Sequence, residues 1–143
     1  MSQNVNSNDD LTGSSNNSAH ARVVKDYFRI TSAVNSHLGN YQDQTAGLKR
    51  GLSHWLNVKG KKVLDLGSGT GELCWLANHM GAESVVGVNL SQDEIDFAKP
   101  HVQATFFCQD ILSYLSQCPA ESVDVIYALN ILEHFTKDEL VKV

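Results

Sequence analysis

The chain has 143 residues, 42% of them hydrophobic and 19% charged, a composition that predicts one folded domain and excludes wholesale disorder. Its 16 acidic residues outnumber its 11 basic ones, for a net charge of −5, so we expect no nucleic-acid partner, because such partners require a cationic surface. We also expect no membrane span and no secretory leader, and three cysteines without a C-x-x-C pair indicate free thiols in a cytoplasmic protein.

The N-terminal part of the sequence consists of a polar segment followed by two amphipathic patterns. Residues 1–18 are rich in serine and asparagine and predict a disordered tail. Apolar residues at spacings of three and four over Val23–Val34 predict a helix. The same spacing recurs from Leu48 onward and predicts a second helix over residues 42–56. We therefore expect a helical segment, residues 19–58, ahead of the main domain.

From residue 59 to residue 143, short apolar runs alternate with amphipathic segments. Strands that alternate with helices are typical of an α/β fold with a mostly parallel sheet and right-handed crossovers. Two S/T-x-x-E spacings, at Ser91 and at Thr136, predict capping boxes at helix starts. The predicted strands are residues 63–66, 84–88, 104–108 and 123–128, and the predicted helices are residues 72–79, 92–99 and 112–117.

A glycine-rich turn, D-L-G-S-G-T-G at residues 65–71, joins the first of these strands to the following helix. Glycine permits positive φ and lets a ligand approach the main chain, and the helix start offers unpaired N–H groups. No lysine follows Gly71, which disfavours a nucleoside triphosphate, and the glycine spacing differs from the dinucleotide fingerprint. Asp65 at the strand tip would repel a pyrophosphate but would attract an ammonium group. The turn therefore favours a ligand that carries a positive charge.

Four motifs follow one another in residues 60–135: the glycine turn, V-V-G-V-N-L-S at residues 85–91, C-Q-D-I at residues 108–111 and V-D-V-I-Y-A-L-N-I-L-E-H at residues 123–134. In order and spacing they resemble those of the class I S-adenosylmethionine-dependent methyltransferases. The resemblance implies a Rossmann-like, doubly wound sheet, S-adenosyl-L-methionine as cofactor and S-adenosyl-L-homocysteine as product. The residues after the fourth strand, 129–134, are most similar to those of enzymes that methylate small molecules such as sugars or quinones. This resemblance implies a small-molecule acceptor.

The resemblance also implies roles for individual residues. Asp65 and the glycine turn would contact the methionine part of the cofactor, Asp110 would bind the adenine amino group, and Ile111 would pack beside the ring. Leu129 would lie near the sulfonium. His134 is a candidate catalytic general base, with a polar residue packed at a helix start as the alternative. The implied cofactor-binding residues are Asp65, Gly67, Ser68, Gly69, Gly71, Asn89, Leu90, Asp110, Ile111 and Leu129.

Other residues of catalytic type have a plainer interpretation. We expect Asp124 to serve a structural role at the entry to the sheet, and Cys74 and Phe107 to lie in the core. The cysteines and histidines show no metal-ligand spacing, so no metal is expected. Tyr27 and Tyr41 precede the sheet, where aromatic residues of the family often close over the cofactor.

One position departs from the family pattern. The second strand of the family usually ends in Asp or Glu, whose two oxygens accept from both ribose hydroxyls, whereas this chain has Asn89. An amide has one acceptor oxygen, so we expect cofactor binding to be weaker by about ten- to a hundredfold. On this interpretation Asn89→Asp would tighten binding.

The sequence holds four predicted strands, and a complete sheet of this family has more. We therefore expect the sheet to be truncated after the fourth strand, as in the N-terminal part of a longer methyltransferase. Such a sheet would have an exposed edge that favours self-association, and the chain would have little activity alone. The alternatives are a non-catalytic cofactor-binding fragment or interaction module, and a nicotinamide oxidoreductase, which would need the other glycine spacing.

Overall fold

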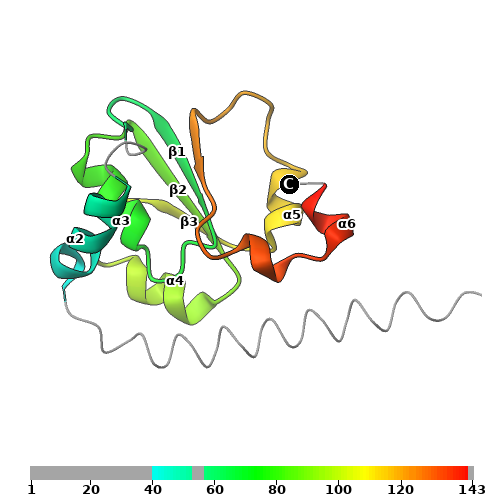
Figure 1. Cartoon of the computed structure of the whole chain (residues 1–143), viewed down its shortest axis with the longest axis horizontal. Coiled ribbons are helices and arrows are strands. Elements are labelled where there is room, and N and C mark those ends of the chain that lie inside the picture. Colours follow the sequence, from blue (N-terminus) through cyan, green and yellow to red (C-terminus); the bar gives the residue numbers. More distant parts are fainter. Residues whose placement is uncertain (1–39, 53–56, 142–143) are drawn as a thin grey trace, which may run out of the picture.

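The computed structural model describes residues 40–52 and 57–141. The predicted tail and the first predicted helix lie outside the described residues, and so does the end of the second predicted helix. The described residues form a parallel β-sheet flanked by helices (Figure 1). The strands are β1 (Lys62–Leu66), β2 (Ser84–Asn89), β3 (Thr105–Cys108) and β4 (Val125–Tyr127). The helices are α2 (Tyr41–Gly51), α3 (Glu72–His79), α4 (Gln92–Ala98), α5 (Ile111–Leu115), the short 3-10 helix η1 (Leu132–His134) and α6 (Lys137–Leu140).

The strand order β3-β2-β1-β4 confirms the predicted α/β, doubly wound sheet, and every strand pair is parallel. The chain adds β2 and then β3 on one side of β1, and it returns to add β4 on the other side. Ligands of open α/β sheets bind at the carboxyl ends of the strands where the winding reverses. This topology therefore directs attention to the carboxyl ends of β1, β2 and β4.

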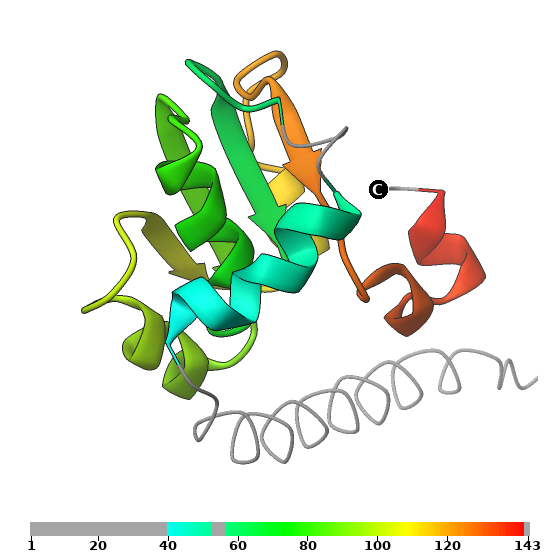
Figure 2. The same cartoon turned by 60° about the vertical axis from the view of Figure 1, so that its left-hand side comes forward.

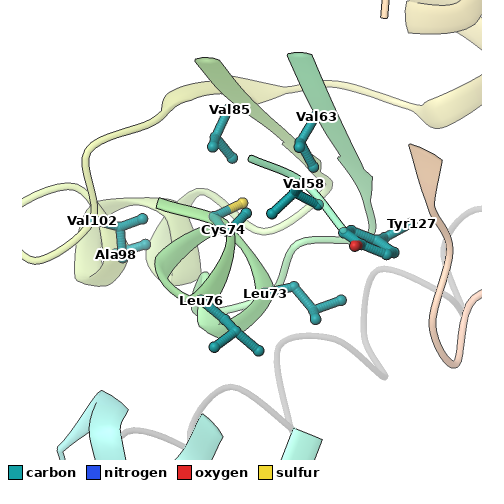
Figure 3. Packing of buried hydrophobic residues seen from close by; sticks show 10 residues of the cluster. Val58, Val63, Leu73, Cys74, Leu76, Val85, Ala98, Val102 and Tyr127 are labelled. Atoms are coloured by element: carbon teal, nitrogen blue, oxygen red, sulfur yellow. The ribbon is translucent and has the colours of Figure 1, made fainter. Parts of the chain in front are cut away.

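Side chains of β1 alternate between two hydrophobic clusters, one on each face of the sheet. Val63 belongs to the cluster that contains α3 residues such as Cys74, whereas Leu64 and Leu66 belong to a cluster with Ile111. Figure 2 shows α2, α3 and α4 on the first face and α5 on the second, and Figure 3 shows Val63 directed toward Cys74. Burial on both faces explains why β1 is apolar along most of its length.

Side-chain caps mark where the helices begin. Asn40, Ser91 and Asp110 each accept a hydrogen bond from the backbone N–H three residues further on, at the starts of α2, α4 and α5. At the start of α6 the predicted capping box is complete, because Glu139 also accepts from the backbone N–H of Thr136 at 2.7 Å. These short polar side chains satisfy N–H groups that a helix leaves unpaired.

The structure confirms one prediction about the outer strands and contradicts another. They concern Asp124, which directly precedes β4, and Phe107 of β3. Asp124 is structural, as predicted, since its Oδ2 accepts from the backbone N–H of Lys62 at 2.8 Å and joins β4 to β1. Phe107 was predicted to lie in the core, but it is 40% exposed. The prediction is wrong because β3 is an edge strand among the described residues, and the Phe107 ring contacts the ring of Tyr114 at the margin of the sheet.

Within the described ranges, no helix has the length and apolarity required to cross a bilayer.

Candidate functional site

The carboxyl ends of the parallel strands bring the implied site residues to one edge of the sheet. The glycine turn leaves β1 there, Asn89 is the last residue of β2, and Asp110 follows β3 by two residues. Backbone hydrogen bonds join these tips. The N–H of Gly67 donates to the carbonyl of Val88 at 2.8 Å, and the N–H of Gln109 donates to the carbonyl of Asn89 at 3.0 Å. The tips of β1, β2 and β3 therefore form one continuous rim.

The glycines of the turn differ in what surrounds them. A Cβ added at Gly71, which has φ +87°, would lie 3.2 Å from Ala98 Cβ and 3.3 Å from Val102 Cγ2, so this glycine lets α3 pack closely on its neighbours. A Cβ added at Gly69, which has φ +51°, would meet no atom within 4 Å. Gly69 is thus the point where the backbone of the turn borders open space, as a ligand-binding turn requires.

Asp65 lies beneath the turn and is almost completely buried, with 2% of its surface exposed. Burial raises its pKa from an ordinary 3.8 to about 7, a hydrogen bond from the Cys74 thiol to Oδ2 at 3.4 Å opposes the shift, and the Glu72 carboxylate adds to it. Tyr127 pairs with Asp65 in the β1–β4 register. Cys74 is buried, as predicted, and it serves as a partner of this carboxyl group.

Asn89 and Glu94 form a buried pair at the tip of β2. The amide Nδ2 of Asn89 donates to Glu94 Oε2 at 2.7 Å, and the two residues are 2% and 5% exposed. Burial raises the pKa of Glu94, the hydrogen bond from Asn89 lowers it, and the charges of Glu72 and Asp93 raise it. Because the amide nitrogen of Asn89 donates to Glu94, the amide oxygen Oδ1 can accept a hydrogen bond from another group.

Ser68 places a hydroxyl at the base of the turn. In the part of the chain that the structure describes, Ser68 Oγ is buried and has no hydrogen-bond partner. A Cβ added at Gly87 of β2 would lie 2.9 Å from this oxygen, so the absence of a side chain at Gly87 makes room for it. A buried polar atom without a partner is unusual in a folded protein, so Ser68 Oγ is a candidate contact for a ligand or a water molecule.

Tyr41 connects α2 to the glycine turn. Its hydroxyl donates to the carbonyl oxygen of Thr70 at 2.6 Å, and its ring stacks on Trp75 of α3 with centroids 6.0 Å apart. Burial raises the pKa of Tyr41 to about 12, and the charges of Glu72 and Cys74 add to the shift. Tyr41, predicted as a candidate for closing over the cofactor, thus contacts the backbone of the turn, whereas Tyr27 lies outside the described residues.

The remaining predicted residues surround this centre. Asp110 is exposed and uses Oδ1 to accept from the N–H of Ser113, and Ile111 is buried behind it. Leu90 follows Asn89 and is half-buried. Two predicted residues lie beyond β4: Leu129 is 38% exposed, and His134 is half-buried in η1.

The segment after β4 approaches the glycine turn through Ile131. A Cβ added at Gly67 would lie 2.8 Å from Ile131 Cδ1, which shows how closely the two segments pack. This contact brings the backbone near Leu129 to the same edge of the sheet as the turn. The catalytic role of His134 stays a prediction.

The predicted capping box at Ser91 is only half formed, because the Glu94 carboxylate bonds to Asn89 instead of to the Ser91 backbone. Sequence reasoning missed this role of Glu94, the bond from Cys74 to Asp65 and the bond from Tyr41 to Thr70. Glu94 had a visible signal, because it is charged although its neighbours Ile95 and Ala98 belong to the buried stripe of α4. Across residues 40–52 and 57–141, no group of three histidine, cysteine, aspartate or glutamate side chains could hold a metal ion. The acidic side chains of the site lie within electrostatic range of one another, since Glu72 raises the pKa of both Asp65 and Glu94.

Comparisons with known proteins agree with this architecture. Residues 63–143, more than half of the chain, match the family model described as a methyltransferase domain, and the chain belongs to this family. A ubiquinone biosynthesis O-methyltransferase from Coxiella burnetii is 37% identical over 88 residues, which are 58% of this chain and 36% of that protein. One from Rhodopseudomonas palustris is 31% identical over 81 residues, 55% of this chain and 32% of that protein. The chain spans about a third of the length of these curated relatives.

Solved structures share the fold. A SAM dependent methyltransferase from Archaeoglobus fulgidus is similar with a TM-score of 0.60 and 25% identity, over 76% of this chain and 47% of that one. The magnesium protoporphyrin IX methyltransferase of Synechocystis, solved with bound SAM, has a TM-score of 0.62 at 21% identity, over 95% of this chain and 70% of that one. At this identity the second likeness concerns the fold alone. Together they confirm the Rossmann-like methyltransferase architecture.

Proposed function

We propose that the chain binds S-adenosylmethionine at the carboxyl edge of the sheet, as part of a methyltransferase that modifies a small molecule. The observation that carries this proposal is the juxtaposition of three features at one edge. These features are the open backbone at Gly69, the buried carboxyl of Asp65 on β1 and the Asn89–Glu94 pair at the end of β2. Membership in the methyltransferase domain family supports the same conclusion.

The residues at this edge fit the chemistry of the cofactor. S-adenosylmethionine has an ammonium and a sulfonium, and the nearby carboxyl groups of Asp65, Glu72 and Glu94 favour a cation. A nucleotide pyrophosphate would be repelled by the same groups. Asn89 has an amide oxygen available for a ribose hydroxyl, and Ser68 Oγ is a second buried polar atom at the base of the turn. The fit therefore extends to both the charged and the sugar portions.

The other end of the cofactor would lie beside β3. Asp110 uses one carboxylate oxygen to cap α5, which leaves the second oxygen for the adenine amino group. Ile111 belongs to the hydrophobic cluster of that face and supplies an apolar contact for a planar ring. Leu90 and Leu129 add apolar surface beyond the tips of β2 and β4.

The chemistry supplied by S-adenosylmethionine is a methyl group already activated by the sulfonium. The protein's contribution is then to bind the cofactor, orient the acceptor and exclude water, since orientation alone lowers a barrier substantially. Leu129 and His134 follow β4 at the edge that the acceptor would reach, and His134 would hold the proton that a hydroxyl acceptor loses. His134 is the residue we propose for this role.

A small molecule with a hydroxyl group is the proposed acceptor. The curated relatives described above are named as O-methyltransferases of ubiquinone biosynthesis, which favours an oxygen acceptor on a quinone-like molecule. The net charge of −5 disfavours nucleic acid as the acceptor. Sugars, which also carry hydroxyl groups, are the second class of acceptor to compare with quinone-like molecules.

Calorimetric titration of the chain with S-adenosylmethionine, S-adenosylhomocysteine and NADH tests the proposal. We expect the first two to bind and NADH not to bind, because the acidic edge repels a pyrophosphate. Transfer of a labelled methyl group to a panel of phenols, sugars and amines then tests the acceptor. We expect little turnover by the chain alone, with phenols methylated ahead of sugars and amines. Binding of NADH without binding of either adenosyl ligand would reject the proposed cofactor.

A further inference from the structure

The Asn89–Glu94 pair has a geometry that a purely structural capping role does not explain. Ser91 and Glu94 have the same spacing as Thr136 and Glu139, yet the two glutamates behave differently. Glu139 accepts from the backbone N–H of its cap residue, whereas Glu94 directs Oε2 to the side chain of Asn89. The Ser91 hydroxyl still caps α4 by accepting from the Glu94 N–H at 3.3 Å. The Glu94 carboxylate is therefore turned from the helix start toward the tip of β2.

The contact determines which way the Asn89 amide faces. A side-chain amide has one donating end and one accepting end, and Glu94 as a carboxylate can only accept. The nitrogen of Asn89 must therefore point to Glu94, and the oxygen Oδ1 is left as the acceptor. With an aspartate at position 89, two buried carboxyl groups would face each other across 2.7 Å, and they would repel each other unless one of them took up a proton.

We propose that Glu94 is a positioning residue of the cofactor site, and that Asn89 and Glu94 together replace the single carboxylate usual at this strand end. Asn89 Oδ1 accepts from a ribose hydroxyl, and Glu94 holds the amide in that orientation and supplies the negative charge. The inference rests on the proposed function, since it presumes an adenosyl ligand with ribose hydroxyls. It reverses the expectation from sequence that Asn89→Asp tightens binding.

Exchange of the two side chains tests the pair. We expect Asn89→Asp to weaken S-adenosylhomocysteine binding at least about tenfold, and Glu94→Gln to weaken it by about three- to tenfold. The double variant Asn89→Asp with Glu94→Gln restores one donor and one carboxylate in exchanged positions. Its affinity should return to within about threefold of that of the unchanged chain, as expected for directly coupled residues. Titration calorimetry measures affinity, and thermal unfolding without ligand measures the fold.

Two controls separate orientation of the amide from general loosening of the fold. Asp93→Asn removes the same charge from the exposed neighbour of Glu94, and affinity should stay within about twofold. In the second control, the ligand is the 2′,3′-dideoxy analogue of S-adenosylhomocysteine, which lacks the ribose hydroxyls. Glu94→Gln should weaken binding of the natural ligand but leave binding of this analogue unchanged.

The outcomes distinguish this inference from the function on which it rests. If the unchanged chain does not bind S-adenosylhomocysteine, the proposed function itself is overturned. If the unchanged chain binds it, then tighter binding by Asn89→Asp, an equal loss on both ligands, or a folded double variant without recovered affinity overturns the role of Glu94 alone. A single variant that fails to fold leaves the double variant as the deciding measurement.

Discussion

At the scale of single residues, we expect Asp65 to make cofactor binding depend on pH. Its pKa in the folded protein is about 7, above the ordinary 3.8, so its contribution to folding stability is fully present below 3.8 and is lost as pH rises through 7. A ligand ammonium favours the ionised carboxylate. We expect affinity for S-adenosylhomocysteine to rise from about pH 6 to about pH 8, and the rise to vanish in Asp65→Asn. Calorimetry across this range measures it, and a flat profile in the unchanged chain would contradict the assignment of Asp65 to the ammonium.

Gly69 and Gly60 allow a matched comparison of backbone strain with ligand access. Both have positive φ, +51° and +68°, and an added Cβ would meet no atom within 4 Å at either position. Gly60 lies in the segment that precedes β1, at the opposite end of the sheet from the glycine turn, and its N–H donates to the carbonyl of Gly81. Changing either residue to alanine should cost a similar free energy of unfolding, about 1 kcal/mol. Only Gly69→Ala should also weaken cofactor binding, by about tenfold or more. Equal affinities in the two variants would place the ligand elsewhere.

At the scale of elements, α2 supports the glycine turn from outside the sheet. Tyr41→Phe removes the donor to the Thr70 carbonyl but keeps the ring on Trp75. We expect a loss of about 1 kcal/mol in the free energy of unfolding, together with a cofactor affinity lowered about two- to fivefold because the turn is less restrained. Chemical denaturation and calorimetry report the two effects separately. An affinity equal to that of the unchanged chain would show that the turn holds its shape without α2.

At the scale of the whole molecule, we expect the negative charge to favour the cationic cofactor over its product, which lacks the sulfonium charge. The chain carries a net charge of −5, and the charge of Glu72 raises the pKa of both Asp65 and Glu94. We expect added salt to weaken binding of S-adenosylmethionine more than binding of S-adenosylhomocysteine, because screening acts on the extra sulfonium charge. Titrations of both ligands at low and high salt measure the difference. Equal salt dependence would mean that the sulfonium lies away from these groups.

The elements of the sheet region were predictable because each depends on a local pattern. Helix α3 has the predicted bounds of residues 72–79, while α5 begins at Ile111, one residue earlier than predicted. The apolar run of β1 and the caps at Ser91 and Thr136 are likewise readable from neighbours in the sequence. Phe107 was not predictable in this way, because its exposure depends on the strand order.

Periodicity, glycine spacing and caps act over a few residues, so the alternation of strands and helices and the glycine turn were readable from the sequence alone. The family resemblance was carried by four ordered motifs. Only the tertiary structure decided the partners of the site's polar groups. The Glu94 carboxylate turns from its helix start to Asn89, the Cys74 thiol bonds Asp65, and Tyr41 reaches Thr70. Burial makes an unpaired polar group costly, so each of these groups takes the partner that packing brings near it, and that proximity arises only when the sheet is assembled.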